Sequence, residues 1–146
     1  MVLLISGGFA YIMHRYGFLL IDEMWDPEKI HKYIEELTPK QRDVHIWTTL
    51  TLDVLFPFAY GGLFVGLVWK FLGRSGRLLA LPGALVIPVD LAEGAVQVMA
   101  LSGNTEVVIH KLWVTPIKLG LFVSAALFAL FAIGVALGRK FRATLA

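Results

Sequence analysis

Four apolar stretches divide the chain, and each of them also contains ionisable residues. The stretches cover residues 2–21, 44–72, 78–101 and 112–137. A helix of about 20 mainly apolar residues crosses a bilayer, so all four predict membrane spans. The composition agrees, because 58% of the 146 residues are apolar and 16% are charged, against about 25% charged in soluble domains. We therefore expect an all-α membrane protein, with four transmembrane helices in one domain over residues 1–146.

The basic residues predict the orientation of these spans. They gather at the connection after the second stretch and in the tail after the fourth: Lys70, Arg74, Arg77, Arg139, Lys140 and Arg142. The segment 22–43 instead holds seven acids and four bases. Lys and Arg collect on the cytoplasmic side of membrane proteins. Both termini are therefore expected in the cytoplasm, with 22–43 and 102–111 outside.

The outer segment 22–43 predicts a short amphipathic helix. Asp26 is a suitable N-cap and Pro27 a suitable first residue, and apolar residues then recur at helical spacing among charged ones: Ile30, Tyr33, Ile34 and Leu37. Two placements fit this helix, in the membrane interface or as a lid on the bundle, and the pattern alone favours the interface. Thr38, Pro39 and Gln41 predict a second helix start, which leads directly into the second span.

Polar residues inside the four stretches form the candidate functional site. They are His14, Arg15, Asp53, Tyr60, Asp90, Glu93, Gln97 and Lys118. At a rise of about 1.5 Å per residue, six of them fall at similar depths in the outer half of the bilayer: Arg15, Asp53, Asp90, Glu93, Gln97 and Lys118. A charge in hydrocarbon costs about 2.5–3.5 kcal/mol on insertion scales, so such residues face a bundle interior or a cavity. We therefore expect a polar cluster between the spans.

Two further features concern this cluster. Pro57 removes the backbone hydrogen bond to the carbonyl four residues earlier, which belongs to Asp53, so a backbone acceptor is freed there. The acids Asp53, Asp90 and Glu93 also outnumber the bases Arg15 and Lys118 by one charge if all ionise. A proton, His14 or a ligand must balance that charge.

The residues indicate no single chemistry, and several functions remain open. An accessory or small-ligand-binding subunit is the favoured hypothesis. An enzyme acting on a lipid or isoprenoid is the first alternative, with Asp53, Asp90 and Glu93 as candidate catalytic residues, and a proton-coupled or cation transporter is the second. No nucleophile motif or phosphate loop indicates a reaction, so the sequence does not decide whether the protein is an enzyme.

The expected partners follow from the same residues. The chain has no cysteine and no HExxH motif, and buried carboxylates usually pair with bases or take up a proton, so we expect no metal site. The sequence names no cofactor. The lipid bilayer is the expected surrounding, with a lipid-like ligand and a homo-oligomer or larger membrane complex as further partners. A net charge of +2 is too small to indicate nucleic acid binding.

A set of short motifs lies between residues 19 and 97: Leu19-Leu20-Ile21-Asp22, the amphipathic outer helix, Asp53 followed by Phe56-Pro57 and Tyr60, and Pro88 with Asp90 and Glu93. This set resembles small, uncharacterised bacterial four-span integral membrane proteins. The resemblance implies a four-helix architecture and no activity. An Asn often follows the second acid in that set, whereas this chain has Gly94, so any role of that Asn does not carry over. We expect a multi-pass protein of the bacterial inner (plasma) membrane.

Overall fold

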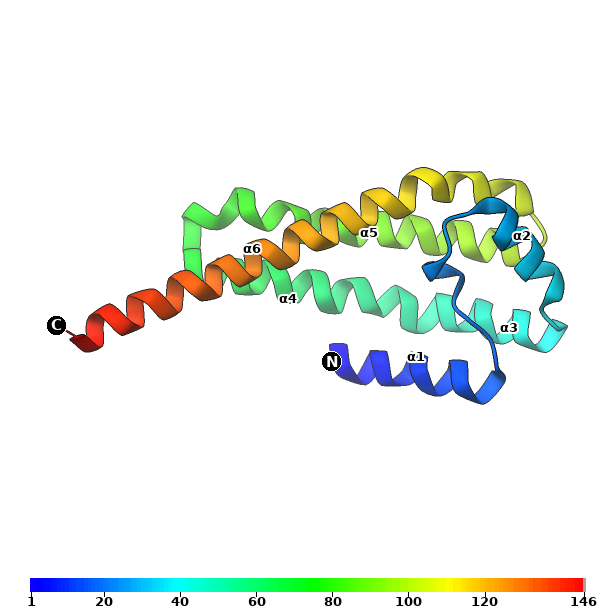
Figure 1. Ribbon diagram of the computed structural model, residues 1–146, viewed down its shortest axis with the longest axis horizontal. Helices are drawn as coiled ribbons and strands as arrows, with labels where there is room; N and C mark the ends of the chain where they lie inside the picture. Colours follow the sequence, from blue (N-terminus) through cyan, green and yellow to red (C-terminus); the bar gives the residue numbers. More distant parts are fainter. Residues whose placement is uncertain (146) are drawn as a thin grey trace.

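Three long helices form the body of the protein: α4 (Val54–Leu72), α5 (Arg77–Leu101) and α6 (Lys111–Leu145). The computed structural model describes residues 1–145, of which nearly all are helical and none lies in a strand. The helix α1 (Val2–Tyr16) lies beside α4, and the short helices gather at one end of the body (Figure 1). Two helical stretches, Pro39–Leu101 and Thr105–Thr144, are long and apolar enough to cross a membrane. The expectation of an all-helical protein is thus confirmed.

The first helix is shorter than expected. It ends at Tyr16 rather than at residue 21, because Gly17 adopts a left-handed conformation (φ 65°) that stops the helix. Its 15 residues measure about 22 Å, less than the roughly 30 Å of a bilayer core. The ring of Phe9 packs edge-on against Phe56 of α4, with their centroids 5.8 Å apart. This helix is therefore a peripheral part of the bundle.

The outer segment forms a lid over one end of the bundle. Its helix α2 (Pro27–Glu36) begins as predicted, since the Asp26 side chain accepts a hydrogen bond from the Glu28 amide at 3.1 Å. The apolar face of α2 lies in a cluster built from the lid, the end of α5 and the loop before α6: Phe18, Ile21, Ile30, Ile34, Leu37, Ala100, Leu101 and Val108. Because its apolar face is buried within the chain, α2 packs on this end of the bundle as a lid.

A continuous helical stretch leads from the lid into α4. The helix α3 (Pro39–Thr48) starts with the predicted capping box, in which Thr38 and Gln41 bond reciprocally. It passes into a π-helical turn, η2 (Thr49–Asp53), and then into α4. The π turn ends at Asp53, four residues before Pro57, so it includes the residue whose carbonyl Pro57 is expected to free. Such turns recur at functional sites.

The body is held together by small residues where the helices approach closely. A Cβ atom on Gly61 of α4 would lie 2.7 Å from the carbonyl oxygen of Gly83 on α5, so the two backbones are nearly in contact there. Helix α6 crosses them (Figure 1) and buries a row of alanines, Ala125, Ala129 and Ala132. It is longer than the expected span 112–137, and its C-terminal end projects beyond the α4–α5 turn (Figure 1).

Candidate polar cluster and lateral pocket

Lys118 of α6 lies at the centre of the polar cluster. Its ammonium nitrogen is 2.6 Å from Asp22 Oδ1 and 3.2 Å from Asp90 Oδ1, and it also contacts Glu93 Oε2. The three acids come from two elements, because Asp90 and Glu93 lie one turn apart on α5 while Asp22 lies on the short turn η1 (Ile21–Glu23). One cation thus joins α5, α6 and the base of the lid.

Lys111, at the first position of α6, supplies a second buried cation. It has no exposed surface, and its ammonium lies 2.8 Å from Glu93 Oε1 and donates to the Ile21 carbonyl at 3.1 Å. Thr115 donates to the same Glu93 oxygen. Because Lys111, Thr115 and Lys118 are spaced at i, i+4 and i+7, they form one stripe of α6 that faces Glu93.

The turn η1 is anchored so that Asp22 points into the bundle. The Ile21 amide donates to Nε2 of the buried His45 at 3.5 Å, and Gln97 donates to Asp22 Oδ1 at 3.0 Å. Burial alone would raise the pKa of Asp22, but the adjacent Lys118 ammonium, with Lys111 behind it, holds that pKa below its ordinary value. Asp22 is therefore an anion bound to the cluster.

Aromatic side chains border the cluster on another side, where Phe56, Tyr60 and Phe122 line a pocket of about 180 Å³ together with Asp22, Asp90 and Lys118. The Tyr60 hydroxyl donates to Asp90 Oδ2 at 2.6 Å, while its ring packs against Phe56, Phe64 and Phe122 at centroid distances of 5.2, 6.0 and 5.1 Å. Beyond this layer the core is apolar, built around Val68, Ala80 and Ala132. The polar cluster is thus confined to one half of the bundle.

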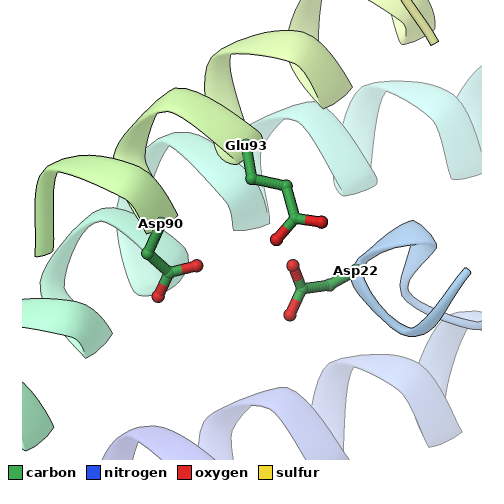
Figure 2. A group of neighbouring side chains, drawn as sticks. All are labelled: Asp22, Asp90 and Glu93. Carbon is green, nitrogen blue, oxygen red and sulfur yellow. The ribbon is translucent and has the colours of Figure 1, made fainter. Parts of the chain in front are cut away.

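The three acids have the arrangement of a metal site but already hold a cation. Figure 2 shows the carboxylates of Asp22, Asp90 and Glu93 pointing toward one another, and one oxygen of each lies within 4.8 Å of the others. The Lys118 ammonium contacts all three, and therefore stands where a metal ion would bind. This arrangement favours ion pairing within the chain over metal binding.

Asp53 lies at the edge of the cluster, in a lateral pocket of about 330 Å³ between η2 and α5. The pocket is lined mainly by apolar residues, with Thr49, Asp53 and Asp90 as its polar ones: Thr49, Leu50, Asp53, Val54, Asp90, Leu91, Gly94, Ala95, Val98 and Met99. Gly94 opens it, since a Cβ atom there would lie 3.7 Å from Asp53 Oδ2. Within residues 1–145, no hydrogen bond or ion pair engages the Asp53 carboxylate.

The structure brings together most of the residues that the sequence singled out. Five of them contact one another directly or through one shared side chain: Tyr60, Asp90, Glu93, Gln97 and Lys118. Asp53 joins them through the lateral pocket, which Asp90 also lines.

His14 and Arg15 do not join the cluster. Both side chains are exposed, and the Arg15 guanidinium lies over the ring of Tyr16 instead, 5.8 Å from its centroid. Their expected depth matches that of the cluster, but both residues lie on a face of α1 that is exposed. The base expected from Arg15 is supplied by Lys111.

Two charged residues of the cluster, Lys111 and Asp22, are not predicted by the sequence. Lys111 falls in the expected outer loop because it precedes the apolar part of the last stretch. Its helical spacing from Thr115 and Lys118 is the signal that could have placed it on the same face as Lys118. Asp22 falls in the expected outer segment, and its return into the bundle depends on the three-residue turn η1. No pattern in the sequence indicates that return.

Comparisons of the chain with protein-family models, with curated proteins and with solved structures found no match.

Proposed function

We propose that this protein binds a small amphiphilic ligand in the lateral pocket, with the ligand's polar end at Asp53 and its apolar part against α5. The observation that carries the proposal is the Asp53 carboxylate, which has no partner among the described residues although the neighbouring acids are all paired. A carboxylate that lines a mainly apolar pocket is stabilised by a proton, a hydrogen-bond donor or a cation.

The charge of the cluster favours a cationic polar end. Four carboxyl groups lie in or beside it, on Asp22, Asp53, Asp90 and Glu93, against the ammonium groups of Lys111 and Lys118. If all ionise, the negative charges are in excess. An amine at Asp53 would reduce this excess where the low dielectric makes it most costly.

The rim of the pocket suits a ligand that enters from the lipid. Leu50 and Met99 are nearly half exposed on the side of the bundle, where a membrane protein meets acyl chains. An apolar tail would replace lipid contacts at this rim, and only the polar end would enter the bundle.

A transport function is opposed by the aromatic layer. The rings around Tyr60 and the apolar core beyond them offer no polar side chain on which a proton or cation could continue toward the other end. The enzyme alternative would depend on Asp53, since Asp90 and Glu93 are engaged in ion pairs and Asp53 is the one candidate acid without a partner among the described residues.

Binding of a fluorescent long-chain amine to the purified protein tests the proposal. We expect the wild type to bind it, and Asp53→Asn to weaken binding about tenfold or more, as loss of one charged partner costs at least about 1.4 kcal/mol. Gly94→Leu should abolish binding by filling the pocket. Gly62→Leu is the matched control, because nothing lies within 4 Å of a Cβ atom at Gly62.

The same binding experiment can also refute the proposal. Equal binding by the wild type, Asp53→Asn and Gly94→Leu would place the amine elsewhere and refute the pocket. A long-chain alcohol and a fatty acid serve as competitors: the alcohol should displace the amine weakly, and the fatty acid should not displace it. Displacement by the fatty acid alone would reverse the charge assignment.

We also propose four membrane crossings, with the lid outside and the α4–α5 turn in the cytoplasm of a bacterial cell. The first crossing, α1, is shorter than a bilayer core, and a membrane accommodates such a helix by thinning locally. The distribution of basic residues and the two apolar helical stretches support this topology.

Labelling of introduced cysteines tests this topology. The chain contains no cysteine, so a single introduced cysteine is the only thiol that can react. A membrane-impermeant thiol reagent on intact cells with a permeabilised outer membrane should label Glu36→Cys and spare Arg74→Cys. Labelling of both sites, or of Arg74→Cys alone, would overturn the proposed topology.

A further inference from the structure

The end of the bundle opposite the lid contains a basic pocket of about 290 Å³, which is lined by Trp69, Gly73, Arg74 and Arg77. It lies at the turn η3 (Gly73–Gly76) between α4 and α5. Gly73 has a positive φ of 58°, a conformation that favours glycine and lets the chain reverse tightly. The reversal places Arg74 and Arg77 within one pocket.

A third arginine approaches the same place from α6. The Arg139 guanidinium donates to the Phe71 carbonyl at 3.3 Å, which ties the basic end of α6 to the α4–α5 turn. Two basic segments that are far apart in the sequence therefore meet at one end of the bundle. Lys140 and Arg142 follow Arg139 on the projecting part of α6 and are exposed.

The flanking sequence supplies no carboxylate to balance these charges. It contains no Asp or Glu from residue 54 to residue 89, or from residue 107 to residue 146. The guanidinium groups of the pocket are thus available to an anion from outside the chain. Arginine presents a fork of N–H donors that matches phosphate oxygens, so a phosphate group is the best-fitting ligand chemistry.

The surroundings of the pocket indicate where that phosphate comes from. Trp69 is 58% exposed and Leu78, in the first turn of α5, is 78% exposed. Tryptophan at such a position is typical of the membrane–water boundary, and the apolar surface beside it can take acyl chains. A soluble phosphate compound would gain nothing from this surface.

We propose that the basic pocket binds the headgroup phosphate of an anionic phospholipid, with Arg74 and Arg77 as its direct ligands and Arg139 as an additional cation. The inference rests on the proposed membrane location and is independent of ligand binding at Asp53. Polybasic ends of membrane helices attract anionic lipids, and a pocket adds a defined position to that attraction.

Native mass spectrometry in a neutral detergent tests this, with phosphatidylglycerol as the probe and phosphatidylcholine as the zwitterionic comparison. We expect retained phosphatidylglycerol adducts on the wild type and about tenfold weaker retention on Arg74→Gln/Arg77→Gln. The matched control, Lys140→Gln/Arg142→Gln, removes the same charge outside the pocket and should bind nearly as the wild type does. Retention on Arg74→Lys/Arg77→Lys should fall between these two values, because lysine keeps the positive charge but lacks the paired N–H donors of arginine.

Three outcomes would overturn the proposal. Equal losses in the two glutamine double variants would mean diffuse attraction rather than a pocket. Equal retention of phosphatidylcholine and phosphatidylglycerol would remove the role of the net charge. Displacement of the lipid by millimolar inorganic phosphate would identify a soluble phosphate as the ligand. Because the probe differs from the long-chain amine, failure here leaves the lateral pocket untouched, and failure there leaves the basic pocket untouched.

Discussion

The Lys118 ammonium lies 2.6 Å from the Asp22 carboxylate, so an ion pair links the base of the lid to the N-terminal part of α6. Asp90 and Glu93 share the same ammonium. Lys118→Met should therefore lower the free energy of unfolding by about 3–5 kcal/mol, because it leaves buried carboxylates without their common cation. Denaturant titration in detergent micelles measures this loss.

A double-mutant cycle separates the pair from the rest of the cluster. Asp22→Asn in the Lys118→Met background should recover part of the lost stability, since one unpaired anion is removed. The coupling should lie at about 0.5–3 kcal/mol, as it does for residues in contact. Simple additivity of the two substitutions would show that the pair makes no separate contribution.

Acidification should weaken the contribution of Asp22. Its pKa is held below the ordinary value because Lys118 and Lys111 together outweigh the effect of burial. A lowered folded-state pKa stabilises the protein above the unfolded value of about 4, and that stabilisation is lost as the pH falls through the folded pKa. The difference in unfolding temperature between the wild type and Asp22→Asn should thus be constant from about pH 7 to pH 5 and shrink below about pH 4. The control is Asp43→Asn, which removes a carboxylate at an exposed position outside the cluster.

Removal of the second buried cation should open the lid. Lys111→Met keeps most of the side-chain volume but removes one partner of Glu93 and one partner of the Ile21 carbonyl. We expect a loss of about 3–5 kcal/mol and faster hydrogen exchange at the amides of α2. The exposed Lys32 is the matched control, and Lys32→Met should leave exchange unchanged. Equal exchange in both variants would refute the anchoring role of Lys111.

Two adjacent glycines should respond in opposite ways to the same substitution. A Cβ atom on Gly61 would lie 2.7 Å from the backbone oxygen of Gly83, whereas one on Gly62 meets nothing within 4 Å. Gly61→Ala should lower stability by about 1–3 kcal/mol through overpacking, and Gly62→Ala should be neutral or slightly stabilising. Thermal unfolding of the two variants tests the α4–α5 contact, which would be refuted if both behaved alike.

Helical periodicity was sufficient to group most of the cluster. It placed Asp90, Glu93 and Gln97 on one face of α5 and Asp53 and Tyr60 on one face of the second span, because a continuous helix fixes these relations within two or three turns. The capping residues Asp26 and Thr38 were equally predictable, since their signals are local. Both sets agree with the structure.

Arg15 and Asp22 show where such reasoning stops. The sequence gives the depth of a residue along a span but not the rotation of the helix about its axis. In α1 that rotation leaves Arg15 exposed, away from the cluster. The position of Asp22 depends on a short turn whose direction is set by His45, Gln97 and Lys111, all distant in the sequence. Relations of this kind arise from tertiary packing, which a single sequence does not display.

The ion pair between Asp22 and Lys118 also bears on how the protein is made. Ninety-six residues separate the two partners, so the N-terminal part of the chain leaves the ribosome long before its counterion has been synthesised. Until α6 arrives, Asp22 has neither of its lysines, and the lid has nothing to close upon. Insertion of the last helix is then the event that locks the earlier segments in place, and truncation before residue 111 should leave a chain that membrane quality control degrades.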